Sequence, residues 1–331
     1  MQSLALTMGE PAGIGPEITL KAWLMRGGKM RVPFFVIGDP SLYAAQARQH
    51  ALDVPLREIT SPAEAAACFD DALPVLPYRL SSPVRPGRLD PQNAAAVMAS
   101  IDVGCDLALA GTVSGLVTNP IHKRVLYEAG LAVPGHTEYL AARTGGAIPV
   151  MMLSCPGLRV VPVSVHVPLA DVARVLTRDM IVAKGRILAH ALRRDLGIAA
   201  PRIAVAGLNP HAGEEGHIGR EEIDIITPAI EVLRADGLDV SGPLPADTLF
   251  HAAARERYDA ALCMYHDQAL IPIKTIDFDH GVNSTLGLPI VRTSPDHGTA
   301  LDIAGRGMAH PGSLIAALQL AGQMAANRAR A

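Results

Sequence analysis

Short apolar runs alternate with helical patterns along almost the whole chain. Start and stop signals predict a helix from Pro16 to Gly27 and another from near Glu221 to Gly237. Helical spacing of apolar residues predicts a pair of helices over about residues 169–196, with Thr177 capping the second. Strand-like runs stand between them, at residues 4–6, 34–37, 107–110, 160–165, 203–206 and 260–264. Strands that alternate with helices predict an α/β fold with mainly parallel strands, and 331 residues are enough for two domains.

The composition supports this fold class and excludes several kinds of function. Hydrophobic residues make up 49% of the chain and aromatic residues only 4%, so the core must consist mainly of aliphatic side chains. A net charge of −3, with no stretch rich in Lys and Arg, argues against nucleic-acid binding. We expect neither a signal peptide nor a membrane span, since no uncharged apolar run approaches ~20 residues. The cysteines form no C-x-x-C pair, which is typical of reduced thiols in a cytoplasmic protein; they are Cys68, Cys105, Cys155 and Cys263.

Two glycine-rich segments stand near the two ends of the chain, at residues 8–17 and 296–307. The first leads into a predicted helix, but Ile18 occupies the place of the third glycine in the G-x-G-x-x-G dinucleotide fingerprint. Such a turn is either a purely structural connection or an anion site, because unpaired N–H groups at a helix N-terminus attract negative charge. Both segments are therefore candidate ligand sites.

Three histidines follow strand-like runs: His166, His211 and His266. A lone histidine after a strand is usually a core or surface residue, and gaps of 45 and 55 residues match no local zinc motif. The carboxyl ends of parallel strands nevertheless meet at one edge of a sheet, where ligands of α/β proteins bind. Three neutral imidazoles would leave the charge of a divalent cation uncompensated and a coordination position open, which favours a Lewis-acid role.

Further candidate residues have the chemistry of an anion site. His136 and Thr137 precede a predicted helix and either cap it or bind a carboxylate or phosphate there. Lys274, Asn283 and Arg292 lie in one late, largely apolar segment, where an unpaired cation is costly. Because a guanidinium binds phosphate in a bidentate manner, these residues predict a clamp for a phosphorylated substrate.

Two carboxylates accompany this late segment. Asp247 either caps a helix beginning near Thr248 or transfers a proton, and sequence alone does not decide between these roles. Asp267 directly follows His266, so it is placed to orient that imidazole or to accept a proton itself. Lys274 is a third candidate for proton transfer.

The chain resembles the 4-hydroxythreonine-4-phosphate dehydrogenases, a family of pyridoxal phosphate biosynthesis. The likeness runs through nearly the whole length, in TMGEPAGIGPE at 7–17, PGHTE at 134–138, GLNPHAGE at 207–214, YHDQ at 265–268 and RTSPDHGTA at 292–300. More distantly, residues 13–17 and 297–307 are similar to isocitrate and isopropylmalate dehydrogenases, which bind their dinucleotide without a Rossmann fingerprint. The resemblance implies two α/β domains with a cleft between them, one formed by residues 1–130 and 260–331 on the cofactor side and the other by residues 131–259 for substrate and dimerisation.

The resemblance also implies site residues, a homodimer and cofactors. It implies one zinc, cobalt or magnesium ion per site, held by His166 and His211 together with His266 of the partner subunit. It places the substrate on His136, Thr137, Lys274, Asn283 and Arg292. It implies NAD or NADP as the oxidant, with candidate contacts at Gly13, Ile14, Gly15, His297, Gly298 and Asp302.

The reaction implied by the resemblance is oxidation of the C3 hydroxyl of 4-phosphooxy-L-threonine. The resulting β-keto acid loses carbon dioxide and gives 3-amino-2-oxopropyl phosphate. Related enzymes oxidise 4-phospho-threonate or aromatic cis-dihydrodiols, and these remain alternatives. A metallohydrolase would leave both glycine segments unexplained, and a non-catalytic binding protein would leave the eight metal and substrate residues unexplained.

Overall fold

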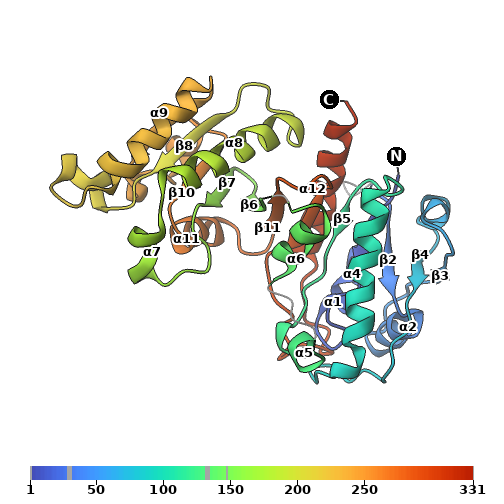
Figure 1. Ribbon diagram of the computed structural model, residues 1–331. Coiled ribbons are helices and arrows are strands. Elements are labelled where there is room, and N and C mark those ends of the chain that lie inside the picture. Colours follow the sequence, from blue (N-terminus) through green and yellow to red (C-terminus); the bar gives the residue numbers. More distant parts are fainter. Residues whose placement is uncertain (1, 28–31, 131–134, 147, 331) are drawn as a thin grey trace. The chain divides into compact units, whose positions relative to one another are not determined.

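The structure is a computed structural model that describes residues 2–27, 32–130, 135–146 and 148–330 (Figure 1). The chain divides into two compact units. Unit 1 comprises Met1–Pro149 and Leu288–Ala326, and unit 2 comprises Val150–Gly287 and Asn327–Ala331. The sequence predicted domain boundaries near 130/131 and 259/260, whereas the two units divide at 149/150 and 287/288. The division of cofactor and substrate roles between the domains stays a prediction.

Unit 1 contains a parallel sheet with strand order β3-β4-β2-β1-β5-β12. Its strands are β1 (Leu4–Thr7), β2 (Phe34–Gly38), β3 (Leu56–Glu58), β4 (Leu73–Pro77), β5 (Leu116–Val117) and β12 (Arg292–Pro295). Its helices are α1 (Gly15–Leu24), α2 (Pro40–Gln49), α3 (Ala65–Cys68), α4 (Ala94–Leu109), α5 (Lys123–Glu128), α6 (His136–Arg143) and most of α12 (Gly312–Arg328). Because β1 and β2 are apolar and fully buried, they form the centre of this unit, as expected for strands covered on both faces.

Unit 2 contains a mixed sheet with strand order β11-β6-β7-β10-β8-β9. Its strands are β6 (Val150–Cys155), β7 (Leu158–Pro162), β8 (Arg202–Ala206), β9 (Asp239–Leu244), β10 (Ala260–Cys263) and β11 (Val282–Leu286). Its helices are α7 (Leu169–Val175), α8 (Arg178–Arg194), α9 (Thr227–Ala235), α10 (Ala252–Arg255) and α11 (His266–Ile276). β7, β10, β8 and β9 run parallel, whereas β6 pairs antiparallel with both β7 and β11. The predicted α/β fold with mainly parallel strands is confirmed.

Most predicted elements occur, but one strand prediction is wrong. Residues 107–110 form the end of α4 and the turn after it, and the side chain of Leu109 is 45% exposed. A short apolar run does not distinguish a strand from the last turn of an alanine-rich helix. The predicted helix pair is confirmed as α7 and α8, with Thr177 Oγ1 accepting the Met180 N–H at 3.2 Å. Within the described ranges, no helix is long and apolar enough to cross a membrane.

Candidate active site

Two of the three predicted histidine ligands lie together in unit 2. His266 is the first residue of α11, shortly after β10, and His166 lies shortly after β7, the parallel neighbour of β10. Their ring centroids are 6.2 Å apart, and the two planes are tilted by 41°. Both rings line a pocket of about 420 Å³ whose wall includes Leu169, Tyr265 and Asp267. Adjacent parallel strands therefore bring these two imidazoles of one chain to one pocket.

His211 follows β8, the other parallel neighbour of β10, but does not line this pocket. It lies in the turn Pro210–Gly216, and its side chain is exposed. Within the described residues of one chain, no three His, Cys, Asp or Glu side chains are grouped closely enough to hold a metal ion. A cation shared by the three histidines therefore remains a prediction.

The two candidate aspartates have different surroundings. Asp267 Oδ1 lies 2.7 Å from His266 Nδ1. A carboxylate on Nδ1 fixes the ring orientation and leaves Nε2 as the donor for a ligand, as in carboxylate–histidine–metal arrangements. Asp247 lies inside the short 3-10 turn Ala246–Thr248, whose N-cap position is Pro245, so the capping interpretation of Asp247 is wrong.

A cluster of cationic and imidazole groups lies in unit 1, where α6 begins and β12 begins. Arg292 is only 3% exposed, and its guanidinium donates to Thr118 Oγ1 at 2.7 Å. Burial lowers the pKa of Arg292 to about 10, against the opposing charge of Glu138, so it stays charged at neutral pH. Desolvation, followed by the charges of Arg292 and Lys123, lowers the pKa of His136 to about 3. His136 is therefore a neutral imidazole beside two cations.

One nitrogen of this cluster has no hydrogen-bond partner in the part of the chain that the structure describes. His136 Nε2 is buried and has no hydrogen bond to any described residue. Buried polar groups are almost always hydrogen-bonded, so an exception indicates a place for a ligand. Thr137 follows in the first turn of α6, whose N-cap, Gly135, makes no side-chain cap, and Pro134 of the same motif lies outside the described residues. The capping role considered for His136 and Thr137 is not observed.

The other predicted substrate residues lie in unit 2. Lys274 lies in the last turn of α11, with Nζ 5.7 Å from the ring centre of Phe278, and Asn283 lies in β11. The structure thus groups His136, Thr137 and Arg292 in one unit, and the meeting of all five residues at one substrate stays a prediction. Sequence reasoning missed Lys123, whose charge acts on His136, because a single lysine at the start of a short helix carries no distinctive pattern.

The two glycine-rich segments contact each other within unit 1. Ile14 donates its backbone N–H to the carbonyl of Thr299 at 3.0 Å. A Cβ atom on Gly13 would lie 2.8 Å from that carbonyl oxygen, so this close approach requires glycine. α1 begins at Gly15, immediately beyond the contact. Among the later candidates, Gly298 and Asp302 are exposed, and His297 is partly buried.

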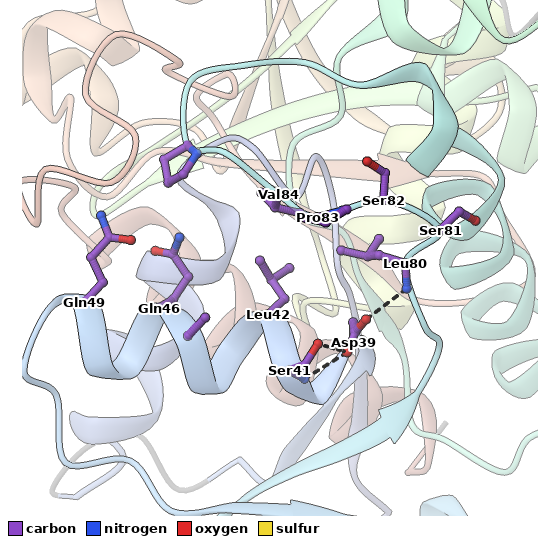
Figure 2. A pocket seen from close by; sticks show the side chains of 12 residues that line it. Asp39, Ser41, Leu42, Gln46, Gln49, Leu80, Ser81, Ser82, Pro83 and Val84 are labelled. Carbon is purple, nitrogen blue, oxygen red and sulfur yellow. Dashed lines mark hydrogen bonds between the residues drawn. The ribbon is translucent and has the colours of Figure 1, made fainter.

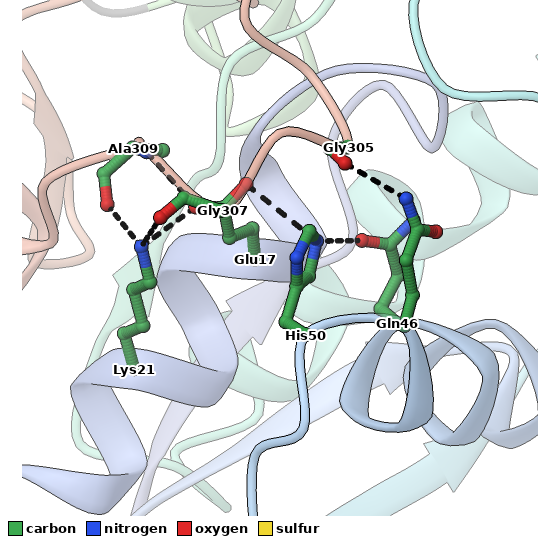
Figure 3. A network of polar contacts seen from close by, with 8 residues as sticks. Glu17, Lys21, Gln46, His50, Gly305, Gly307 and Ala309 are labelled. Atoms are coloured by element: carbon green, nitrogen blue, oxygen red, sulfur yellow. Dashed lines mark hydrogen bonds and ion pairs between the residues drawn. The ribbon is translucent and has the colours of Figure 1, made fainter.

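A buried polar network fixes the later segment onto α1 (Figure 3). Glu17 is 1% exposed, and its Oε1 accepts from Lys21 Nζ at 2.7 Å and from the Ala309 N–H at 2.9 Å. Lys21 Nζ also donates to the carbonyls of Gly307 and Ala309, at 2.9 and 2.7 Å. His50 Nε2 lies 3.7 Å from Glu17 Oε2. Since the network joins both candidate cofactor segments, it determines their relative position.

A further pocket of about 440 Å³ lies between α2 and residues 80–86 (Figure 2). It adjoins the carboxyl ends of β2 and β4, and Gln49 in its wall donates to the carbonyl of Gly305 at 2.8 Å. Asp39 at its base accepts from the backbone of Ser41 and Leu80, so this carboxylate holds the pocket wall together. Sequence patterns gave no sign of this hollow, because residues 80–86 form no regular element.

The chain is similar in sequence and in structure to known proteins. Residues 30–321 match the family of the pyridoxal phosphate biosynthetic protein PdxA. The 4-hydroxythreonine-4-phosphate dehydrogenase of Caulobacter vibrioides is 56% identical over 333 residues, covering 98% of each chain. The crystal structure of the Klebsiella pneumoniae enzyme of that name superposes with a TM-score of 0.88 at 39% identity, with 98% of each chain covered.

A related solved structure is the terephthalate 1,2-cis-dihydrodiol dehydrogenase of Burkholderia xenovorans, with a TM-score of 0.66 and 30% identity over 97% of this chain and 98% of that one. Both solved relatives are dehydrogenases, and the first is more similar to this chain in sequence and in structure. The matched residues 30–321 include the histidine pocket, the cluster of Arg292, His136 and Lys123, and the later glycine-rich segment. The chain therefore belongs to the PdxA family of oxidoreductases of pyridoxal phosphate biosynthesis.

Proposed function

We propose that this chain oxidises the C3 hydroxyl of 4-phosphooxy-L-threonine with NAD or NADP, in a reaction that depends on a divalent cation. The oxidised product is a β-keto acid, which loses carbon dioxide to give 3-amino-2-oxopropyl phosphate for pyridoxal 5′-phosphate. Family membership and the 56% identity to a 4-hydroxythreonine-4-phosphate dehydrogenase support this assignment. The observation that carries it is the cluster of the buried Arg292, the partly buried and neutral His136 and the exposed Lys123.

This cluster suits the phosphate or carboxylate of such a substrate. Burying a guanidinium is costly unless an anion or several acceptors compensate it. Arg292 binds an oxyanion in a bidentate manner, Lys123 adds a second charge, and the buried Nε2 of His136 supplies a hydrogen-bonding group that does not compete for a proton. Thr137, Lys274 and Asn283 complete the proposed substrate contacts. Binding energy at the anionic groups then holds C3 in place for the chemical step.

The histidine residues have the donor chemistry that a zinc or cobalt ion prefers. Neutral imidazoles suit such an ion, and Asp267 on Nδ1 leaves His266 Nε2 directed to a ligand. We propose that His166 and His211 of one subunit hold the ion together with His266 of the partner subunit. A divalent cation bound there would lower the pKa of the substrate hydroxyl and stabilise negative charge on its oxygen.

Exposed apolar side chains support a second subunit at the histidine pocket. Leu169 forms part of the pocket wall and is 72% exposed, and Ile271 on α11 is 63% exposed. Exposed apolar side chains that adjoin a largely apolar pocket are typical of an interaction surface. We propose a homodimer in which this surface is covered and His266 of the partner subunit completes the metal site.

The dinucleotide is proposed to bind where the two glycine-rich segments meet. Gly13, Ile14 and Gly15 lie at the N-terminus of α1, next to Thr299, while His297, Gly298 and Asp302 provide the opposite side. A bound nicotinamide would supply the acceptor for the C3 hydrogen, which leaves with its electron pair as hydride. The proton of the hydroxyl passes to a protein group, for which Lys274, Asp247 and Asp267 are the candidates. The contact of Asp267 with His266 favours an orienting role for that carboxylate.

The test is a comparison of alcohols as substrates. Purified protein, NAD or NADP and an added divalent cation are mixed in turn with 4-phosphooxy-L-threonine, 4-phospho-threonate and an aromatic cis-dihydrodiol, and formation of the reduced nucleotide is followed by absorbance. The largest kcat/KM is expected for 4-phosphooxy-L-threonine. A larger value for either other alcohol would replace the proposed substrate, and no reduction with any of the three would contradict the reaction class.

A further inference from the structure

The segment that carries His211 has an uncommon backbone conformation. Residues 211–215 all have positive φ, with values of 52°, 54°, 80°, 43° and 57° for His211, Ala212, Gly213, Glu214 and Glu215. Residues with a Cβ rarely adopt this left-handed region, and consecutive residues do so more rarely still. A strained backbone of this kind persists only when its surroundings hold it, and such segments concentrate at functional sites.

A buried carboxylate holds the start of this turn. Glu222 is 3% exposed, and its Oε1 accepts the backbone N–H groups of Leu208 and Asn209, both at 2.7 Å. Its Oε2 accepts from Asn209 Nδ2 at 2.9 Å. The same Oε2 would lie 2.5 Å from a Cβ on Gly213, so the carboxylate packs directly against the turn. Glu222 opens the π-helical turn Glu222–Ile226, a type of irregularity that is frequent at functional sites.

A buried amide joins the ends of β8 and β10. Gln268 is 7% exposed, and its Nε2 donates to the carbonyl of Gly207, just after β8, at 2.7 Å. Its Oε1 accepts the backbone N–H of Met264, just after β10, also at 2.7 Å. The single side chain of Gln268 therefore fixes the distance between the strand end that leads to His211 and the strand end that leads to His266.

The connection continues to the third strand end. Ser164, which lies between β7 and His166, donates both its backbone N–H and its hydroxyl to the carbonyl of Met264, at 3.1 and 2.8 Å. The carbonyl of Met264 thus accepts from Ser164, and its N–H donates to Gln268 Oε1. β7, β10 and β8 lie side by side in that order (Figure 1). This series of buried hydrogen bonds therefore links the ends of β7, β10 and β8, which lead to the predicted ligands His166, His266 and His211.

We infer that Gln268 and Glu222 are positioning residues for the histidine site. Gln268 keeps the three strand ends in register, and Glu222 holds the left-handed turn that presents His211. Neither side chain is proposed to touch the metal ion. The inference rests on the proposed metal site. Within one chain these residues fix His166 and His211, which hold one ion, and also the chain's own His266, which completes the site of the other subunit in the proposed dimer.

The test uses cobalt(II) as the probe, because its visible absorption reports binding without turnover. Gln268→Met removes both buried hydrogen bonds of that side chain, and Glu222→Gln puts an NH2 donor in place of the oxygen that accepts from Asn209 Nδ2, both at nearly constant volume. Glu231→Gln, exposed on α9, is the matched control. We expect the Kd for cobalt(II) to rise about 10- to 100-fold in the first two variants, as is typical when groups behind metal ligands are changed. The control should bind like the parent protein. The melting temperature of each metal-free variant is measured alongside.

The outcomes separate three explanations. A folded Gln268→Met or Glu222→Gln protein that binds cobalt(II) like the parent overturns the inference, even if its metal-free melting temperature falls, because the residue is then merely structural. If Gln268→Met does not fold, Ser164→Ala is used instead, because it removes only the hydroxyl hydrogen bond to the Met264 carbonyl. An unchanged Kd for cobalt(II) in Ser164→Ala overturns the role of this series of hydrogen bonds. His166→Ala and His211→Ala test the metal site itself, and unchanged cobalt(II) affinity in both contradicts the proposed site together with the inference built on it.

Discussion

The imidazole of His136 is held neutral beside the buried guanidinium of Arg292. Desolvation and the charges of Arg292 and Lys123 lower the pKa of His136 to about 3, far below its ordinary value of 6.5. A neutral imidazole and a cation side by side bind an anion without adding a group that titrates near neutral pH. The pH dependence of substrate binding is therefore expected to arise elsewhere, including in the substrate phosphate.

This relationship predicts a specific acid sensitivity. Because the folded-state pKa of His136 is lowered, the unfolded chain binds a proton at this residue below about pH 6.5, whereas the folded chain does so only near pH 3. Stability is therefore lost as the pH falls through this window, by about 2 kcal/mol between pH 6.5 and 5. His136→Asn should lose less stability on acidification, as measured by urea unfolding across this range. His190→Asn, at an exposed position on α8, is the control, and an unchanged slope in His136→Asn would contradict the assignment.

Arg292→Lys should weaken binding of the phosphorylated substrate. Lysine keeps the charge but loses the planar fork that reaches both an oxyanion and Thr118 Oγ1. We expect KM for 4-phosphooxy-L-threonine to rise about 10- to 100-fold, the cost of one to two charge-assisted hydrogen bonds. KM for the dinucleotide should stay near the parent value. Steady-state kinetics with both substrates provides the measurement, with Arg178→Lys, at an exposed position, as the control.

Lys21→Met should affect the dinucleotide selectively. The variant loses three hydrogen bonds, to Glu17 and to the carbonyls of Gly307 and Ala309, and so releases the later glycine-rich segment. KM for NAD or NADP is expected to rise about tenfold, while KM for the phosphorylated substrate changes little. Faster hydrogen exchange in the peptides covering residues 305–309 should accompany the effect. Equal changes in both KM values would instead indicate a general loss of structure; Arg124→Met, in an exposed ion pair, controls for loss of charge.

Asp195→Ala should destabilise unit 2 without a direct effect on the site. Asp195 is fully buried and accepts from Arg194 at 2.7 Å and from Arg328 at 2.8 Å. Burial raises the pKa of Asp195, but the hydrogen bonds and charges of Arg328 and Arg194 outweigh it and hold the pKa below the ordinary value of 3.8. Its contribution to stability is therefore present above pH 3.8 and is lost as the pH falls through the lower folded-state pKa.

Removing one partner of a buried ion pair costs about 3–5 kcal/mol, because the remaining charge is left uncompensated. Denaturant unfolding of Asp195→Ala at neutral pH provides the measurement. Asp236→Ala removes the partly exposed pair with Arg186 on the surface of the same unit, and its expected cost is below about 1 kcal/mol. Equal losses in the two variants would contradict the importance of burial at Asp195.

The fold could be predicted from the sequence wherever periodicity and length agreed. The buried run at 34–37 and the amphipathic stretch at 178–194 were clear for this reason, and both elements are present as β2 and α8. Residues 107–110 were misassigned, because alanine and leucine alternate there as they would in a strand. β6 and its antiparallel pairing with β7 were missed, although the Pro156-Gly157 turn between them, with Gly157 at a φ of 81°, is a recognisable hairpin signal.

The candidate site was predictable only in part. Parallel-strand logic places His166 and His266 together, since each follows a neighbouring strand of one sheet. The same logic does not foresee the left-handed turn at His211, because the run Ala212-Gly213-Glu214 contains only one glycine to suggest positive φ. Gln268 also escaped notice as a positioning residue, because its role depends on a backbone carbonyl at Gly207 that is distant in sequence.

The most direct test of the central claim is nucleotide reduction by metal-free protein. The purified protein is treated with a chelator, freed of it, and mixed with 4-phosphooxy-L-threonine and NAD or NADP before and after addition of zinc or cobalt. The proposed function predicts no reduced nucleotide without the ion, restored formation with it, and no restoration in His166→Ala. Full activity of the metal-free protein would contradict a metal-dependent dehydrogenase built on these histidines.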